Sequence, residues 1–254
     1  MYINDAFSVS HRKQGSIIIP PKYLPGAIGR SFENELKAAD HFVKNKNRKK
    51  IYLLGGTKLE DYISFFKVLR EKESKILASG VLGNAFLASQ GIDLGYENKW
   101  LKNKNYHKLF PILRSLIDEY RRQIILPVDF AIGNKKRKEI LLADTPNDEK
   151  IWDIGARTIA LFKEHLSHSQ AVFMKGPVGY SELPQFSKGT VEILEDISRL
   201  SIKNRTYSLL GGGHLTTTLT TYKIPNHFSS ISLSGGALMA YLAGEKLPGL
   251  EALK

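Results

Sequence analysis

Residues 208–217 read SLLGGGHLTT, and this stretch decides the fold. An apolar segment runs into three consecutive glycines, which are followed by a histidine and by hydroxyl residues that can open a helix. Glycine lets a backbone approach a phosphate closely, and the next helix offers free N–H groups at its positive dipole end. The stretch therefore predicts a strand, a phosphate-binding turn and a helix, in that order.

The same order recurs along the chain. Four further apolar segments end in glycine-bearing turns: KIYLL (50–54), SKILA (74–78), AVFMK (171–175) and HFSSIS (227–232). We predict strands at these four segments, at TYSLL (206–210) and at ILPVDFAI (125–132). Helices are predicted over 31–45, 59–70, 107–122, 153–166 and 186–200. A further helix is predicted to begin near Asn84, and the last one to end near Gly244. Such alternation predicts an α/β fold, a Rossmann-like three-layer arrangement of a parallel sheet with helices on both faces.

The glycine turns indicate where a ligand would bind. The carboxyl ends of parallel strands share one edge of the sheet, and ligands occupy the crevice there. One glycine turn is weak support because tight turns need glycine for steric reasons, but five on one edge indicate a nucleotide or another phosphorylated ligand. Neither G-x-x-x-x-G-K-[ST] nor G-x-G-x-x-G after a strand is present, so a P-loop and a standard dinucleotide site are not expected.

Composition restricts the class of protein. The chain has 254 residues, is 42% hydrophobic and 24% charged, and lacks cysteine, so disulfides and cysteine metal sites are excluded. Its first residues lack the apolar core of a signal peptide and no apolar run approaches the ~18 residues of a membrane span, so we expect a soluble cytoplasmic protein with no membrane partner.

The net charge of +12 favours anionic ligands. Two basic clusters, KNKNRKK (44–50) and NKKRKE (134–139), are interpreted as solvated surface, because no RNA-binding signature or zinc-finger spacing accompanies them. We expect no nucleic-acid partner. A basic nucleic-acid-binding protein stays an alternative that rests on charge alone and that predicts strongly salt-dependent binding.

The first part of the chain differs in character. Residues 1–30 contain IIIPPKYLPG, whose prolines predict an irregular or extended connector. In the helix that follows, Ser31 can serve as the N-cap, and Glu33 and Glu35 fall in the first turns, where the dipole favours them.

The chain resembles the phosphoglycerate kinase family, and most closely its archaeal branch. The segments that carry the resemblance, in order, are NDAFSVSHR (4–12), LLGGTKLED (53–61), ILASGVLGNAFLASQGIDLG (76–95), LPVDFAI (126–132), DIGARTIALF (153–162), KGPVGYSELPQFSKGT (175–190), LLGGGHLT (209–216) and LSGGALMAYLAGEKLPGLEAL (233–253). The resemblance spans essentially the whole chain, and the ordered set is far more specific than any one motif.

The resemblance implies the C-terminal, nucleotide-binding half of a two-domain enzyme. Residues 1–30 would be a remnant of the N-terminal domain with the connector, 31–48 the interdomain helix, and 49–254 the nucleotide-binding domain. The full enzyme moves a phosphoryl group between 1,3-bisphosphoglycerate and ADP in glycolysis, giving 3-phosphoglycerate and ATP. We expect this chain to be a monomer that binds ADP or ATP but is largely inactive alone, either a truncated protein or one half of a split gene. A diverged nucleotide-binding module without kinase activity is the alternative.

The resemblance also implies site residues. The residues that correspond to catalytic groups around the transferring phosphoryl group are Lys58, Gly212, Gly235 and Gly236. Lys58 supplies the positioned cation that this chemistry needs. Glu182 corresponds to a ribose-binding glutamate, and His11 and Arg12 to residues that contact 3-phosphoglycerate. The expected nucleotide-binding residues are Gly55, Gly56, Lys58, Lys175, Gly176, Pro177, Val178, Glu182, Gly211, Gly212, Gly213 and His214.

Five positions depart from the family pattern, and the first three are Tyr62, Lys175 and Ser234. Tyr62 stands where many members have a phosphate-contacting lysine, and we interpret it as a packing residue. Lys175 replaces an asparagine and either restores the missing cation or points to solvent at the rim of the crevice. Ser234 replaces the first glycine of a triplet but keeps the N–H groups in place.

His214 occupies the position of the magnesium aspartate. Histidine is a poor Mg²⁺ ligand, so we expect it to donate to a phosphate oxygen or, without a ligand, to cap the turn. Leu215 replaces a hydroxyl residue, for which Thr216 or Thr217 could substitute. We therefore expect no protein metal site, and Mg²⁺ carried by the nucleotide.

Overall fold

A parallel sheet forms the centre of the computed structural model, which describes residues 1–44 and 49–253. Its strands are β3 (Lys50–Leu54), β4 (Ser74–Ala78), β5 (Ile124–Ile125), β9 (Ala171–Lys175), β10 (Tyr207–Gly211) and β11 (Ser230–Ser232). They form a six-stranded sheet in the order β11-β10-β9-β3-β4-β5, and every neighbouring pair is parallel. The predicted α/β fold is confirmed.

Both faces of this sheet are buried because successive side chains point to opposite sides. Tyr52 and Leu54 of β3 join Phe173 of β9 in one hydrophobic cluster. Leu53 and Met174 belong to a second cluster on the other face. Consecutive residues of β3 and β9 are therefore apolar on both faces, as in a fully covered parallel strand.

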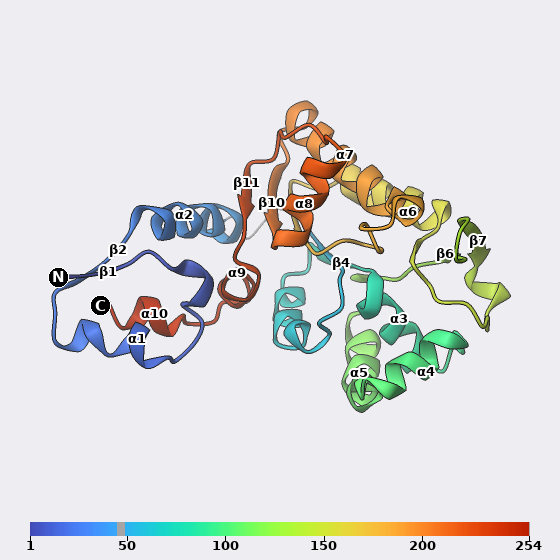
Figure 1. Cartoon of the computed structure of the whole chain (residues 1–254), viewed down its shortest axis with the longest axis horizontal. Helices are drawn as coiled ribbons and strands as arrows, with labels where there is room; N and C mark the ends of the chain where they lie inside the picture. The colour runs from blue at the N-terminus through green and yellow to red at the C-terminus, as the bar shows by residue number, and fades with distance from the viewer. Residues whose placement is uncertain (45–48, 254) are drawn as a thin grey trace.

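Helices cover the two faces separately (Figure 1). The first face is covered by α2 (Arg30–Lys44), α3 (Gly80–Ser89), α5 (Phe110–Tyr120) and α9 (Gly235–Leu242). The second is covered by α6 (Ala156–Ser167), α7 (Lys188–Lys203) and α8 (Gly213–Thr221). Outside these layers lie α4 (Tyr96–Asn103) and short 3₁₀ turns at Tyr106–Leu109, Leu142–Asp144 and Pro184–Phe186. None of the helices in the described residues has the length and apolar character needed to span a bilayer.

The strand predicted over 125–132 is wrong in its extent. Only β5 joins the main sheet, and β6 (Asp129–Ile132) pairs antiparallel with β7 (Lys138–Leu141) and β8 (Asp153–Ile154) in a second sheet. Pro127 lies between the two strands, and a proline cannot donate to a ladder. The chain therefore leaves the main sheet at that point.

Two helix predictions also need correction. The segment 59–70 forms 3₁₀ turns at Glu60–Tyr62 and Ser64–Arg70 instead of an α-helix. Its buried positions fall into two series with a spacing of three, 59, 62, 65 and 68 and then 66 and 69, and three is the repeat of a 3₁₀ helix. The helix expected from Asn84 begins earlier, at Gly80, whose φ of +54° suits glycine at this sharp strand-to-helix turn.

The N-terminus of α2 is capped by a different residue from the one predicted. The helix begins at Arg30, so Ser31 lies inside it and is not the N-cap. Asp5 supplies the acceptor instead, since its Oδ1 accepts the Phe32 N–H at 2.8 Å. This hydrogen bond holds the pKa of Asp5 below its ordinary value. Residues 45–48 of the predicted helix 31–48 lie outside the described residues.

Residues 1–28 form a small lobe together with the end of the chain (Figure 1). Strands β1 (Tyr2–Asn4) and β2 (Gly26–Ile28) pair in parallel. Between them lie α1 (Gly15–Ile18) and 3₁₀ turns at Phe7–Val9 and Pro20–Lys22, so the predicted irregular connector contains short helical turns. Helix α10 (Pro248–Glu251) returns to this lobe, and the Gly249 N–H donates to the Ser10 carbonyl at 2.8 Å.

The two basic clusters are not solvated throughout, which corrects that interpretation. The Lys50 side chain is 1% exposed and its Nζ lies 2.9 Å from Glu71. Arg137 is 15% exposed and reaches the buried Asp153 at 2.7 Å. A run of basic letters does not show which side chain turns inward, because that depends on partners far away in the sequence.

Candidate functional site

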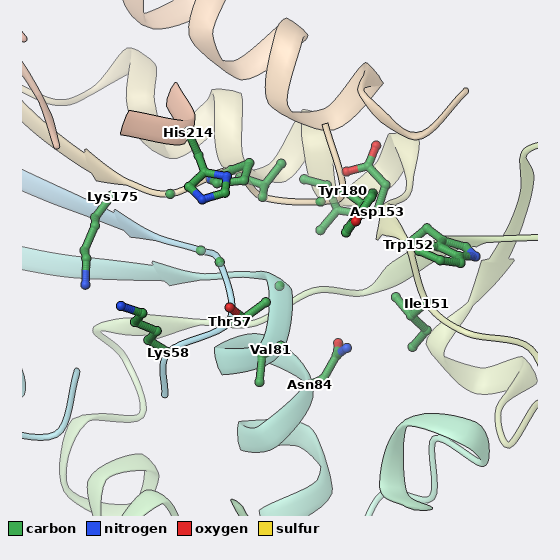
Figure 2. Close-up of a pocket in the computed structure, with 18 of the residues that line it drawn as sticks. Thr57, Lys58, Val81, Asn84, Ile151, Trp152, Asp153, Lys175, Tyr180 and His214 are labelled. Atoms are coloured by element: carbon green, nitrogen blue, oxygen red, sulfur yellow. The ribbon is translucent and has the colours of Figure 1, made fainter. Parts of the chain in front are cut away.

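A cleft of about 620 Å³ opens at the carboxyl edge of the main sheet. The turns after β3, β4, β9, β10 and β11 all line it, as the glycine pattern predicted (Figure 2). Of the predicted nucleotide and catalytic residues, those that line the cleft are Gly55, Gly56, Lys58, Lys175, Gly176, Pro177, Val178, Glu182, Gly211, Gly212, His214, Gly235 and Gly236. Gly213 faces an adjoining hollow together with His214 and Glu182.

The turns after β3 and β9 hold each other. The Gly55 N–H donates to the Lys175 carbonyl and the Gly56 N–H to the Pro177 carbonyl, both at 2.9 Å. A Cβ placed on Gly55 would lie only 2.1 Å from the Pro177 oxygen. Glycine at 55 is therefore required by this close approach of two backbones, whatever the cleft binds.

Lys175 reaches into the cleft rather than to solvent. Its side chain is 13% exposed, and its Nζ lies 3.2 Å from the Asp61 carboxylate and 4.7 Å from the centre of the Tyr62 ring. Burial lowers the pKa of Lys175. Figure 2 shows the amino group of Lys58 at the same end of the cleft. The structure thus brings together two predicted phosphate-binding cations.

Tyr62 is a packing residue, as predicted. It is 2% exposed and its hydroxyl donates to the Gly55 carbonyl. Because its ring lies beneath the Lys175 ammonium, the aromatic face stabilises that cation. Lys175 therefore places its charge directly over position 62, where the family pattern has a lysine.

His214 and Glu182 form a pair that the sequence did not reveal. The His214 Nδ1 lies 3.0 Å from Glu182 Oε1, and both side chains are well exposed at the start of α8. With this nitrogen directed to the carboxylate, the other ring nitrogen is the one left for a ligand. Among the described residues no three acidic or histidine side chains gather as a metal cluster. The two carboxylates of the cleft mouth, Asp61 and Glu182, already contact Lys175 and His214.

The N-terminus of α9 meets the first lobe. Ser234 precedes this helix and donates to the Glu35 carboxylate of α2 at 3.2 Å. A Cβ on Gly236 would lie 3.0 Å from the His11 ring, so this histidine sits directly against the helix start. Burial holds the pKa of His11 below its usual value. Arg12 is exposed and does not line the cleft.

Several cleft residues were not foreseen. Asp61 comes from a 3₁₀ turn, and Asn84 and Glu97 from α3 and α4. Trp152 stacks on Phe186, with ring centres 5.7 Å apart. The glycine turns carried a local signal, whereas these side chains reach the cleft through packing between distant segments.

Asp153 is a buried carboxylate in the cleft wall. Its Oδ2 accepts from Arg137 at 2.7 Å and from the Gly189 N–H at 2.8 Å. Burial nevertheless raises the pKa of Asp153 to about 6, against 3.8 ordinarily. The guanidinium and the backbone N–H oppose this rise, so Arg137 stabilises the charged form of this buried carboxyl group.

Comparison with known proteins gives one consistent family. The family model described as "Phosphoglycerate kinase" matches residues 1–245. The phosphoglycerate kinase of Methanothermus fervidus is 39% identical over 100% of this chain and 62% of its own length. Phosphoglycerate kinase 2 of Methanosarcina acetivorans is 35% identical over 100% of this chain and 61% of its own length. Both organisms are archaea, in accord with the archaeal resemblance.

Solved structures agree. The crystal structure of phosphoglycerate kinase from Pyrococcus horikoshii OT3 superposes with a TM-score of 0.90 at 34% identity, over 99% of this chain and 63% of that chain. The enzyme from Coxiella burnetii, 23% identical with a TM-score of 0.84 over 99% of this chain and 65% of that chain, shows the fold alone. The chain spans about three fifths of the length of the curated relatives it matches.

Proposed function

Since the chain belongs to the phosphoglycerate kinase family, we propose that it is the nucleotide-binding half of such an enzyme. In that role it would bind ADP or ATP for phosphoryl transfer between 1,3-bisphosphoglycerate and ADP, in cytoplasmic glycolysis. Residues 49–254 would form the nucleotide domain, 31–48 the interdomain helix, and 1–30 the remnant of a first domain. We expect a monomer that turns over little by itself.

The observation that carries the proposal is the polarity of the cleft. Glycine turns and the amino groups of Lys58 and Lys175 lie at one end, and Val81, Ile151 and Trp152 lie toward the other (Figure 2). A nucleoside diphosphate has the same division between charged phosphates and an apolar base. Glu182 lines the same cleft, and its carboxylate can accept from vicinal ribose hydroxyls.

Positioned charge would supply the chemistry. Phosphoryl transfer spreads negative charge over the oxygens of the moving group, and fixed cations with free backbone N–H groups stabilise that charge. Lys58, Lys175 and the N-termini of α8 and α9 provide them here. His11 and Arg12 would contribute to a 3-phosphoglycerate site whose other residues lie outside this chain.

Mg²⁺ enters the proposal as part of the nucleotide substrate. The chain offers few free oxygen ligands in the cleft, because Asp61 pairs with Lys175 and Glu182 lies within hydrogen-bond distance of His214. The metal would be held by phosphate oxygens and water, and His214, with both ring nitrogens protonated, would donate to a phosphate through the nitrogen that does not face Glu182. Calorimetric ADP titration with and without Mg²⁺ should therefore show one-to-one binding that Mg²⁺ changes little. No heat at millimolar ADP would contradict the proposal.

Lys175 gives a direct test by substitution. Lys175→Ala should raise the Kd for ADP about tenfold, because a charge-assisted hydrogen bond to a phosphate contributes about 1.5–3 kcal/mol. Asp61, which loses its partner, is 44% exposed and remains hydrated. Calorimetry with Lys203→Ala, an exposed lysine at the end of α7, is the matched control. An unchanged Kd in Lys175→Ala would show that this lysine does not contact the phosphates.

A second candidate is a diverged nucleotide-binding module without kinase activity. The pairing of His214 with Glu182 favours it, since this pair replaces a free carboxylate at the phosphate end. Adding the separate N-terminal domain of an archaeal relative distinguishes the two. Restored ATP formation from 1,3-bisphosphoglycerate supports the kinase half, whereas nucleotide binding without any turnover in the mixture supports the diverged module.

A further inference from the structure

The apolar end of the cleft contains one buried polar pair. Val81, Pro127, Phe130 and Ile151 line this end, and Asn84 and Glu97 lie among them; Lys150 and Asp153 also line the cleft beside Trp152. Asn84 is 5% exposed and Glu97 is 3% exposed. A polar pair in such surroundings must be satisfied by hydrogen bonds, so its orientation is restricted.

Glu97 is fixed by two donors. Its Oε1 accepts the Ile151 N–H at 2.9 Å, and its Oε2 accepts the Asn84 Nδ2 at 3.4 Å. Burial raises the pKa of this carboxyl, and the two hydrogen bonds and the charge of Lys150 oppose the rise. The carboxylate is thereby tied both to the segment before β8 and to α3.

The carboxylate sets the direction of the asparagine amide. A carboxylate only accepts, so Asn84 must turn its NH₂ group toward Glu97, and its Oδ1 is directed elsewhere. No donor within residues 1–44 and 49–253 reaches Oδ1, and this atom is not among the buried polar atoms without a partner. Figure 2 shows the Asn84 side chain rising from α3 into the cleft between Val81 and Ile151. The free polar function that this pair presents to the cleft is thus an acceptor.

We propose that Asn84, oriented by Glu97, determines base specificity by accepting a hydrogen bond from the exocyclic 6-amino group of adenine. This inference rests on the proposed nucleotide-binding function. A 6-oxo purine would present its own acceptor to the Asn84 oxygen, and two buried acceptors facing each other would both remain unpaired. Glu97 acts as a positioning residue, since it contacts the asparagine and not the base.

The test compares ADP with IDP, which differ at position 6 of the purine. Calorimetry on the whole chain should show ADP bound about tenfold more tightly, the factor that corresponds to one unmade buried hydrogen bond. Glu97→Gln keeps the volume but offers an NH₂ group to Asn84. The Asn84 amide can then rotate and donate to the 6-oxo group, so the ratio of the two Kd values should fall to about one or reverse.

Two further variants keep the test decisive. Asn84→Ala removes the acceptor and leaves the Glu97 bond to Ile151 intact, so the ADP preference should also disappear. Glu195→Gln, on the exposed face of α7, is the matched control and should keep the wild-type ratio. Circular dichroism establishes that each variant is folded.

The outcomes separate this inference from the proposed function. Equal Kd values for ADP and IDP in the wild-type chain, or an unchanged ratio in folded Asn84→Ala, would overturn the role of Asn84 while leaving nucleotide binding in place. Absence of binding for both nucleotides would overturn the proposed function, and the base assignment with it.

Discussion

Gly55→Ala is expected to lower ADP affinity at least about a hundredfold. The added Cβ would lie 2.1 Å from the Pro177 carbonyl oxygen, a separation that folded proteins do not tolerate. The turns after β3 and β9 would have to move apart and lose the Gly56–Pro177 hydrogen bond. Since both turns carry the phosphate end of the cleft, a displacement of about 1 Å is enough for such a loss. The affinity is measured by calorimetry.

The same variant should unfold more easily, by about 3 kcal/mol, because overpacking two backbones has no side-chain adjustment that relieves it. Urea unfolding measures this. Gly15→Ala is the control, since its Cβ would meet only the Ile19 Cδ1 at 3.4 Å, an ordinary contact. Wild-type ADP affinity in Gly55→Ala would show that the contact between the two turns is not needed for the cleft.

Arg137→Leu is expected to lower the free energy of unfolding by about 3–5 kcal/mol at pH 8, the cost of leaving a buried charge without its partner. Asp153 is the charge, and its carboxylate loses the 2.7 Å contact with the guanidinium. The loss of the hydrogen bond from Arg137 to the Ile154 carbonyl adds about 1 kcal/mol that does not depend on pH. Urea unfolding at pH 5 and pH 8 measures both parts.

The pH dependence follows from the sign of the Asp153 shift. Its folded-state pKa of about 6 lies above the ordinary 3.8, so the folded protein holds this proton more tightly than the unfolded chain. Stability from this group is therefore complete at low pH and decreases as the pH rises from about 4 through 6. Without Arg137 the pKa rises further, so the cost of Arg137→Leu should be large at pH 8 and much smaller at pH 5.

Two variants check the source of that effect. Lys136→Leu removes an exposed charge one residue away and should change neither value. Adding Asp153→Asn to Arg137→Leu removes the buried charge, and the extra loss at pH 8 should disappear. An equal loss at both pH values in Arg137→Leu would mean that packing, and not the ion pair, gives the effect.

The sequence predicted the main sheet well because its signal is local. Lys50–Leu54 and Ala171–Lys175 have the predicted bounds, since a run of four apolar residues close to a glycine turn is enough to indicate a buried parallel strand. The second sheet was missed because β7 is exposed over its first two residues and half-buried over its last two, and because β8 has only two residues, so neither strand shows an alternating pattern. Its antiparallel pairing depends on contacts between distant segments.

The site divides in the same way. Gly55, Gly176 and Gly212 could be predicted because each of their turns is formed by residues that are consecutive in the sequence. Lys175 and Asp61 are 114 positions apart in the sequence, and His214 and Glu182 are 32 positions apart. The residues around each of them give no local signal that predicts these contacts. Prediction from the residues located the cleft but not the partners that orient its side chains.

The hydrogen bond from the Gly249 N–H to the Ser10 carbonyl affects the order in which parts of the molecule can fold during synthesis. At about 5–20 residues per second, a ribosome adds residue 249 roughly 12–48 seconds after residue 10. Until then the first lobe lacks α10, and Ile17 is not covered by Gly249, which packs against it in the complete structure. Because His11 directly follows Ser10 and lies against Gly236, the contact between the first lobe and the start of α9 is secured only after α10 has been synthesised.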